Sequence, residues 1–393
     1  MLHIRKFEIP YFLAFFLYGF SIIVNTDSYI STFFPMYMNA IIKYTAMALL
    51  FVSLLYRRWP LKRLIGWTAV GILAVVISFV VDKPTLVLSA AILICANEVD
   101  FERIKKCTII FNVIYIVIIV GACVTGFIPD LVFDHNTKIA HSFGFYYYST
   151  LSSIILMISL IAFSLKGKNS CSYPRIFLLT FINMIVYVFT TTRLTFYLYL
   201  ITVFLVIVIQ KKEWISIKNT KFIRILAVLA FPIAAFICLA VSLLYNPGVP
   251  WMKALNAFLT SRIRYNHAGF LLYGVSLFGK PIEMVGGTEL ANGVDVSKYF
   301  YIDSGYVYTL LEYGILIYVL MIIGYALVFR YAVKKEDKSL FIWCIVICIH
   351  ALINNVLIDF ELNPLLLGVP MALQEIRVSR QGRVRIKKSR RIS

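Results

Sequence analysis

The stretch Cys107–Phe127, CTIIFNVIYIVIIVGACVTGF, decides the fold class of this chain. It carries no charged side chain, and it is preceded directly by the basic pair Lys105-Lys106. A helix that crosses a bilayer needs about 20 predominantly apolar residues. The stretch therefore predicts a membrane-spanning helix that starts at a basic, water-exposed edge.

Similar apolar segments recur along the whole chain. Eleven more are Ile9–Val24, Met38–Tyr56, Ile65–Val81, Thr85–Ala96, Tyr147–Leu165, Ile176–Val188, Leu194–Ile209, Ile225–Leu244, Leu311–Phe329, Leu340–Leu357 and Leu365–Leu373. The fourth and twelfth in chain order are short, so they extend into their flanks or form tilted pairs. We expect an all-α polytopic membrane protein of about twelve spans, with residues 1–393 as one membrane domain. The first segment lacks a small-residue cleavage site, so we expect it to be retained.

The composition excludes a soluble class. Hydrophobic residues make up 61% and charged residues 15% of the 393 residues, against about 45–50% and about 25% in soluble domains. The mean hydropathy is +0.85. The seven cysteines have no CxxC pair or metal-ligand spacing, so we expect neither a metal nor a cofactor.

The net charge of +19 comes from short basic runs between apolar segments. This distribution excludes nucleic acid as a partner and instead sets orientation in the membrane. With the amino terminus inside, 29 Lys and Arg residues fall on inner segments and 8 on outer ones. We therefore expect both termini to be cytoplasmic, with the basic tail 374–393 on anionic lipid headgroups.

One predicted outer segment, residues 246–310, is much longer than the others. Long loops without regular structure are uncommon and usually functional. Its part Trp251–Leu277 has apolar residues at helical spacing, which predicts a helix along the outer interface.

Two outer motifs carry arginine. Thr190-Thr191-Thr192-Arg193 follows the seventh segment, and Leu259-Thr260-Ser261-Arg262-Ile263-Arg264-Tyr265 lies in the long loop, followed by His267. Arg193 can be a snorkelling anchor or part of a polar pocket. Arg262 and Arg264 point about 200° apart on a helix, so we do not expect them to share one task. A guanidinium is a rigid, permanently charged fork that suits a phosphate; His267 is either a structural polar residue or a base.

A third motif, Asp303-Ser304-Gly305-Tyr306, leads to Glu312 at the start of the tenth segment. Asp303 can cap the following helix, or it can orient an arginine or accept a sugar hydroxyl. Glu312 would be costly against lipid, so we expect it to face the bundle interior.

Together these motifs resemble those of the Wzy-type polysaccharide polymerases, in the branch of Gram-positive capsule and exopolysaccharide clusters. The resemblance lies in TTTR, LTSRIRY…GVSLFGKPI, IDSGYVYTLLEYGI, and the stretch Lys138–Phe145 before the sixth segment. Tyr146-Tyr147-Tyr148 stand where related proteins tend to carry an Asn-Pro pair.

The resemblance implies a membrane glycosyltransferase on the outer face of a bacterial cell membrane. It would join undecaprenyl-diphosphate-linked oligosaccharide repeat units, without a metal, beside a flippase and a chain-length regulator of the same pathway. Arg193 and Arg262 would stabilise the departing diphosphate, and Asp303 would orient the acceptor or act as base. Further substrate-binding candidates are Arg264, His267, Tyr306, Glu312 and His141.

Two alternatives remain open. A glycan ligase of the O-antigen ligase type would share the loop and the arginines but usually relies on a catalytic histidine in the loop. A lipid-linked oligosaccharide flippase would show repeated halves and polar residues at the midplane; this sequence shows neither feature.

Overall fold

The computed structural model describes residues 5–57, 59–134, 139–166, 171–210, 217, 220–286, 289 and 293–378. Within them the chain is almost entirely helical. The α-helices are α1 (Glu8–Gly19), α2 (Met36–Leu55), α3 (Leu61–Val81), α4 (Thr85–Cys95), α5 (Phe101–Val124), α6 (Ser149–Ser164), α7 (Tyr173–Thr190), α8 (Arg193–Leu205), α9 (Lys221–Leu243), α10 (Pro250–Phe258), α11 (Arg262–Tyr273), α13 (Gly305–Lys335) and α14 (Lys338–His350). Residues 369–378 are also helical and follow a short 3₁₀ turn at Pro364–Gly368.

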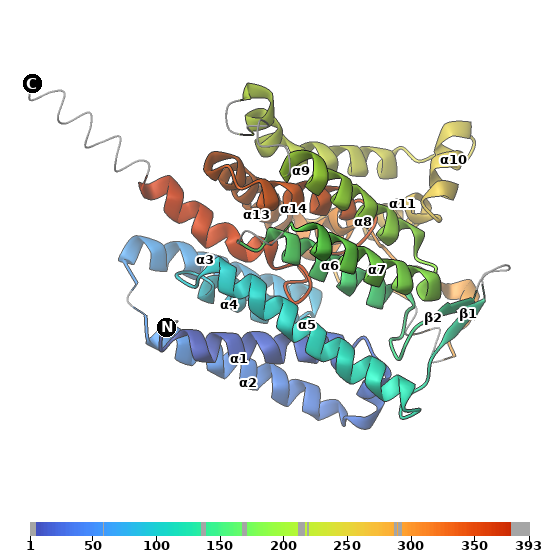
Figure 1. Ribbon diagram of the computed structural model, residues 1–393, viewed down its shortest axis with the longest axis horizontal. Coiled ribbons are helices and arrows are strands. Elements are labelled where there is room, and N and C mark those ends of the chain that lie inside the picture. The colour runs from blue at the N-terminus through green and yellow to red at the C-terminus, as the bar shows by residue number, and fades with distance from the viewer. Residues whose placement is uncertain are drawn as a thin grey trace, which may run out of the picture.

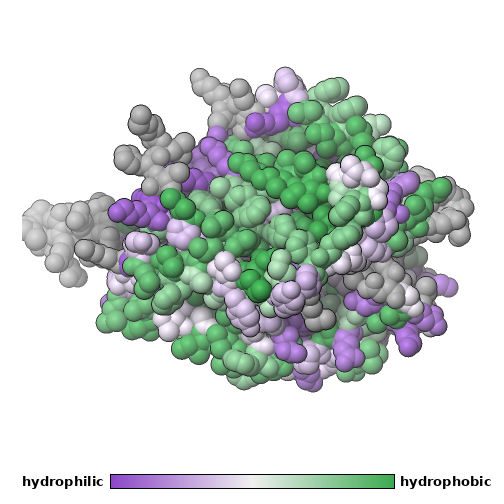
Figure 2. Space-filling model, turned by 90° about the horizontal axis from the view of Figure 1, so that it is seen from below, coloured by the Kyte–Doolittle hydropathy of each residue, from purple (hydrophilic) through white to green (hydrophobic). Residues whose placement is uncertain are grey.

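Most apolar segments predicted from the sequence coincide with helical structure, but Leu340–Leu357 is helical only as far as His350, and the chain turns from Ala351 on. Six helices (α2, α3, α5, α7, α9 and α13) are long and apolar enough to cross a membrane. The others, including α4 and the twelfth segment, are shorter, so the number of spans stays a prediction. Hydrophobic residues cover most of the centre of the face shown in Figure 2, and hydrophilic residues gather toward its margins.

The helices lie side by side along the long axis of the molecule (Figure 1). The start of α1 and the helix 369–378 lie at one end; α10 lies at the other end. A small hairpin of β1 (Val132–Asp134) and β2 (Ile139–His141) also lies at the α10 end, and it pairs Phe133 with Ala140. The all-α prediction did not include this hairpin, because three-residue strands leave no alternating pattern long enough to detect.

The predicted loop helix forms as two helices, α10 and α11. Thr260 and Ser261 between them have φ of 52° and 66°. This left-handed backbone is uncommon outside glycine, and it turns the chain sharply just before Arg262. The turn therefore separates the two helices and sets where α11 begins.

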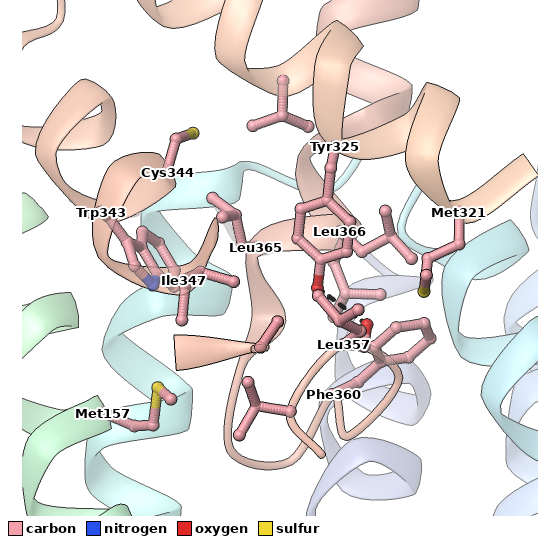
Figure 3. Packing of buried hydrophobic residues seen from close by; sticks show 14 of the residues in the cluster. Met157, Met321, Tyr325, Trp343, Cys344, Ile347, Leu357, Phe360, Leu365 and Leu366 are labelled. Atoms are coloured by element: carbon pink, nitrogen blue, oxygen red, sulfur yellow. Dashed lines mark hydrogen bonds between the residues drawn. The ribbon is translucent and has the colours of Figure 1, made fainter. Parts of the chain in front are cut away.

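The core is densely packed around α13, α14 and the chain segment that follows α14. Tyr325 donates a hydrogen bond to the Leu357 carbonyl at 2.7 Å, and Leu366 and Phe360 pack nearby (Figure 3). Trp343 is fully buried in the same cluster. This packing fixes α13, whose amino-terminal end reaches the α10 end of the bundle.

Helix α13 is broken at Gly314, which has φ 77° and ψ 176°. The loop segment at Gly279 crosses the break, and the Lys280 amide donates to the Glu312 carbonyl at 3.2 Å while the Ile315 amide donates to the Ser276 carbonyl at 3.1 Å. A Cβ on Gly314 would lie 2.3 Å from the Gly279 nitrogen. Only glycine lets two backbones approach this closely, so the crossing fastens the long loop to the helix that follows it.

Candidate functional site

A polar cavity of about 530 Å³ opens at the α10 end of the bundle. Its lining comes from four separate parts of the chain. The residues are Tyr147, Tyr148, Ser149, Thr191, Thr192, Arg193, Leu194, Thr195, Thr260, Ser261, Arg262, Tyr265, Tyr299 and Asp303. The structure thus brings together Arg193, Arg262 and Asp303, the three residues that the sequence put forward as catalytic.

Three helices begin at this cavity, because the residues that precede α6, α8 and α11 (Tyr148, Thr192 and Ser261) line it. Helix α13 begins beside it, since Asp303 lines the cavity and the next residue, Ser304, is fully buried. A helix N-terminus carries about half a positive charge. The Arg264 amide in the first turn of α11 already donates to Asn256 Oδ1 at 3.0 Å, and the Gly305 amide of α13 donates to the Ala351 carbonyl at 3.0 Å, so these two amides are not free for a ligand. The N-terminal ends of α6 and α8, together with the two arginines, therefore favour an anion in the cavity.

Arg193 is the first residue of α8, and its side chain is exposed at the cavity. Among the described residues its guanidinium has no hydrogen-bond or ion-pair partner. A cation at a helix N-terminus opposes the dipole and costs about 0.3–1 kcal/mol of stability. Its position is thus unfavourable for folding and favourable for binding an anion.

Arg262 is the first residue of α11 and forms an ion pair with Asp303, with Nε and Oδ2 3.2 Å apart. Its guanidinium also donates to the Thr260 hydroxyl. Burial raises the pKa of Asp303 above its ordinary value of 3.8, and the Arg262 guanidinium opposes this rise. Asp303 does not cap α13, because Ser304 precedes that helix; it orients Arg262 instead.

Four tyrosines form the remaining wall. The rings of Tyr147 and Tyr148 lie 4.4 Å apart, and those of Tyr265 and Tyr299 lie 5.3 Å apart edge to face. Burial and the Asp303 carboxylate raise the pKa of Tyr299, which keeps its phenol protonated. The sequence did not single out these residues for the site. The Tyr146–Tyr148 run was its one visible signal, since it replaces an expected Asn-Pro pair.

Arg264 and His267 lie on α11 but do not line the cavity. Arg264 is exposed and lies against the Tyr265 ring, where it donates to the phenol oxygen at 3.0 Å. The His267 Nδ1 lies 2.9 Å from the Ser242 carbonyl oxygen, which ties α11 to α9. The different directions expected for Arg262 and Arg264 are seen in the structure.

Tyr306 and Glu312 on α13 also lie outside the lining. Tyr306 is fully buried and donates to the Cys348 carbonyl at 3.0 Å, so it joins α13 to α14. Glu312 faces the interior as expected, and its Oε1 lies 3.5 Å from the Lys83 ammonium. Both residues have positions typical of structural side chains.

His141 belongs to the hairpin rather than to the cavity. Its Nδ1 lies 2.6 Å from Asp130 Oδ2, while Asp130 Oδ1 accepts from the Ser142 and Phe143 amides. Phe133 on the facing strand packs on Tyr147 and Tyr148. Successive residues of a strand point to opposite faces. His141 follows the residue that pairs with Phe133, so it points to the other side of the hairpin, toward Phe189.

In the described part of the chain, no three His, Cys, Asp or Glu side chains lie close enough to hold a metal ion. Comparisons with protein-family models, curated proteins and solved structures find no match to this chain.

Proposed function

We propose that this chain is a membrane glycosyltransferase that polymerises oligosaccharide repeat units linked to undecaprenyl diphosphate. The observation that carries the proposal is the convergence of two arginines and the N-terminal ends of three helices on one cavity. Such a cavity suits a group with several negative charges, as a lipid diphosphate has. The apolar helices beside it keep a lipid-linked substrate at the membrane surface.

The chemistry follows from charge development. In the transfer, the bond from the sugar's anomeric carbon to the diphosphate breaks, and a hydroxyl of the incoming unit forms the new glycosidic bond. Negative charge grows on the departing diphosphate, and fixed donors aimed at it lower the barrier. The Arg193 guanidinium has no partner among the described residues and can donate hydrogen bonds to this charge. The Arg262 guanidinium, ion-paired with Asp303, is a second donor.

Asp303 is the candidate base for the acceptor hydroxyl. Its pKa is raised and therefore lies nearer to the pH at which the protein works, as suits a general base. Tyrosine rings beside it offer flat apolar faces with a polar edge, and a sugar ring can pack on them. The departing diphosphate is a weak base and needs little protonation.

The proposed placement is the plasma membrane of a bacterium, with about twelve spans, both termini cytoplasmic and the cavity outside. The alternation of basic segments along the sequence supports this orientation, with 29 Lys and Arg residues on the predicted inner segments and 8 on the predicted outer ones. A flippase would deliver the units, and a chain-length regulator would act on the product.

Deletion of the gene tests the proposal. We expect single repeat units to accumulate on lipid at the outer face while long polymer disappears. Accumulation on the cytoplasmic face alone would support a flippase instead. Full-length polymer that stays on lipid and fails to reach its final carrier would support a ligase.

A further inference from the structure

A second cavity lies inside the helix bundle, away from the arginines. It holds about 240 Å³ between α3, α4, α13 and residues 358–373. Its walls are almost entirely apolar; apart from the Trp67 indole, Ser89 is the one polar lining residue among those the structure describes. The Ser89 hydroxyl is already hydrogen bonded, to Tyr18 at 2.9 Å and to the Thr85 carbonyl at 3.0 Å. The cavity is therefore an apolar volume, and the Ser89 hydroxyl in its lining already has hydrogen-bond partners.

The surroundings of this cavity are hydrocarbon if α3 and α13 cross the membrane. Both are apolar and long enough to do so. Two lining residues on α13, Leu320 and Ile323, are 44% and 50% exposed, so the cavity opens sideways on this helix. An apolar cavity of this size excludes water, and at this depth only hydrocarbon chains are available to fill it.

An ion pair lies beyond one end of the cavity and joins its two walls. Lys83 sits in the turn between α3 and α4, and Glu312 lies on α13, five residues before the lining residue Ile317. Glu312 is fully buried, whereas the Lys83 side chain is 37% exposed. An ammonium has three donors, so Lys83 can hold Glu312 and still face a headgroup.

We infer that this cavity binds one acyl chain of an anionic outer-leaflet phospholipid, with the lipid phosphodiester at Lys83. The Lys83 ammonium is partly exposed whereas the Glu312 carboxylate is fully buried, so a phosphodiester, which carries one negative charge, meets the positive end of this pair. A diphosphate carries more charge and is served by the arginines of the other cavity. The inference rests on the membrane placement in the proposed function but not on glycan transfer.

The first test fills the cavity. The protein is placed in nanodiscs of phosphatidylglycerol and phosphatidylcholine, extracted in mild detergent, and examined by native mass spectrometry. We expect retained phosphatidylglycerol in the wild type, and its loss in Ala90→Phe and in Leu320→Trp, both of which replace lining residues. Ala69→Phe is the matched control, because Ala69 is exposed on α3 and does not line the cavity. Retention in either cavity variant that still unfolds cooperatively would overturn the inference.

The second test concerns the headgroup. Lys83→Gln/Glu312→Gln removes both charges together, so no buried carboxylate is left unpaired. We expect its preference for phosphatidylglycerol over phosphatidylcholine to fall, by at most the about fivefold that roughly 1 kcal/mol per surface lysine gives, because the carboxylate is removed together with the ammonium. An unchanged preference, or displacement of phosphatidylglycerol by equimolar undecaprenyl phosphate, would overturn the phospholipid assignment. Polymer synthesis by the same variants is scored separately, since its failure concerns the proposed function alone.

Discussion

Replacement of Arg193 should change activity and stability in opposite directions. The guanidinium belongs to the first residue of α8, it is exposed, and it has no partner among the described residues. Arg193→Gln therefore breaks no described contact and relieves the repulsion between a cation and the positive end of the helix. The expected gain in stability is about 0.3–1 kcal/mol at most.

The same change should severely reduce polymer formation. Removal of one donor that stabilises developing charge typically costs about 10²–10³ in rate. Arg193→Lys keeps the charge but loses the planar fork that binds two oxygens at once. We expect it to have the wild-type stability and an activity much nearer to that of Arg193→Gln than to that of the wild type.

The assay uses purified protein with lipid-diphosphate-linked repeat units, product length on a gel, and thermal unfolding in the same detergent. Arg264→Gln is the control, because Arg264 is exposed near the start of α11 but lies outside the cavity lining. Normal polymer from Arg193→Gln would remove the diphosphate role. A drop in the melting temperature alongside activity would show that Arg193 is structural.

Three further predictions concern the fold, the ion pair and the topology. Gly314→Ala should lower the free energy of unfolding by about 1–3 kcal/mol through backbone strain, and by more because a Cβ there would overlap Gly279. Gly121→Ala on α5, where a Cβ meets open space, should instead raise it by up to about 1 kcal/mol, and thermal unfolding compares the two. The pKa of Asp303 is raised in the folded state, so the folded protein binds a proton there more tightly than the unfolded chain does. The wild type should therefore lose stability relative to Asp303→Asn as pH rises above 3.8. A difference in melting temperature between the two proteins that is constant from pH 4 to 7 would contradict this. A cysteine introduced at Asp134 should react with an impermeant reagent added from outside the cell and one at Lys335 should not; labelling of Lys335 would reverse the assigned orientation.

The helices could be predicted from the sequence because apolar length is a local property. Most segments, from Ile9–Val24 to Leu365–Leu373, coincide with helical structure, and the helices of the long loop follow its apolar spacing. The exception is Leu340–Leu357, which leaves the helix after His350 although its apolar character continues. The turn at Thr260 and Ser261 was not predictable, because neither residue type signals a left-handed backbone. Gly279 and Gly314 were visible as glycines, but their contact joins positions distant along the chain.

The site was predictable in its residues and not in its architecture. Arg193 and Arg262 stood out because outer basic residues are uncommon in a chain with basic inner segments, and Asp303 stood out by its motif at the start of the tenth segment. The convergence of three helix N-termini and Asp303 depends on how α6, α8, α11 and α13 pack, which no local pattern shows. The further substrate-binding candidates named from the sequence were Arg264, His267, Tyr306, Glu312 and His141, and packing places all five outside the lining.

The order of these elements along the chain has a consequence for biosynthesis. Tyr148 and Arg193 are synthesised early, whereas Asp303 and the Gly314 crossing come roughly 110 residues after Arg193, or about 5–20 s later at common rates of translation. Helix α11 ends 30 residues before Asp303, and until α13 follows it has neither its ion pair nor the backbone hydrogen bonds that fasten its loop to α13. The proposed anion site is therefore complete only after α13 has been inserted.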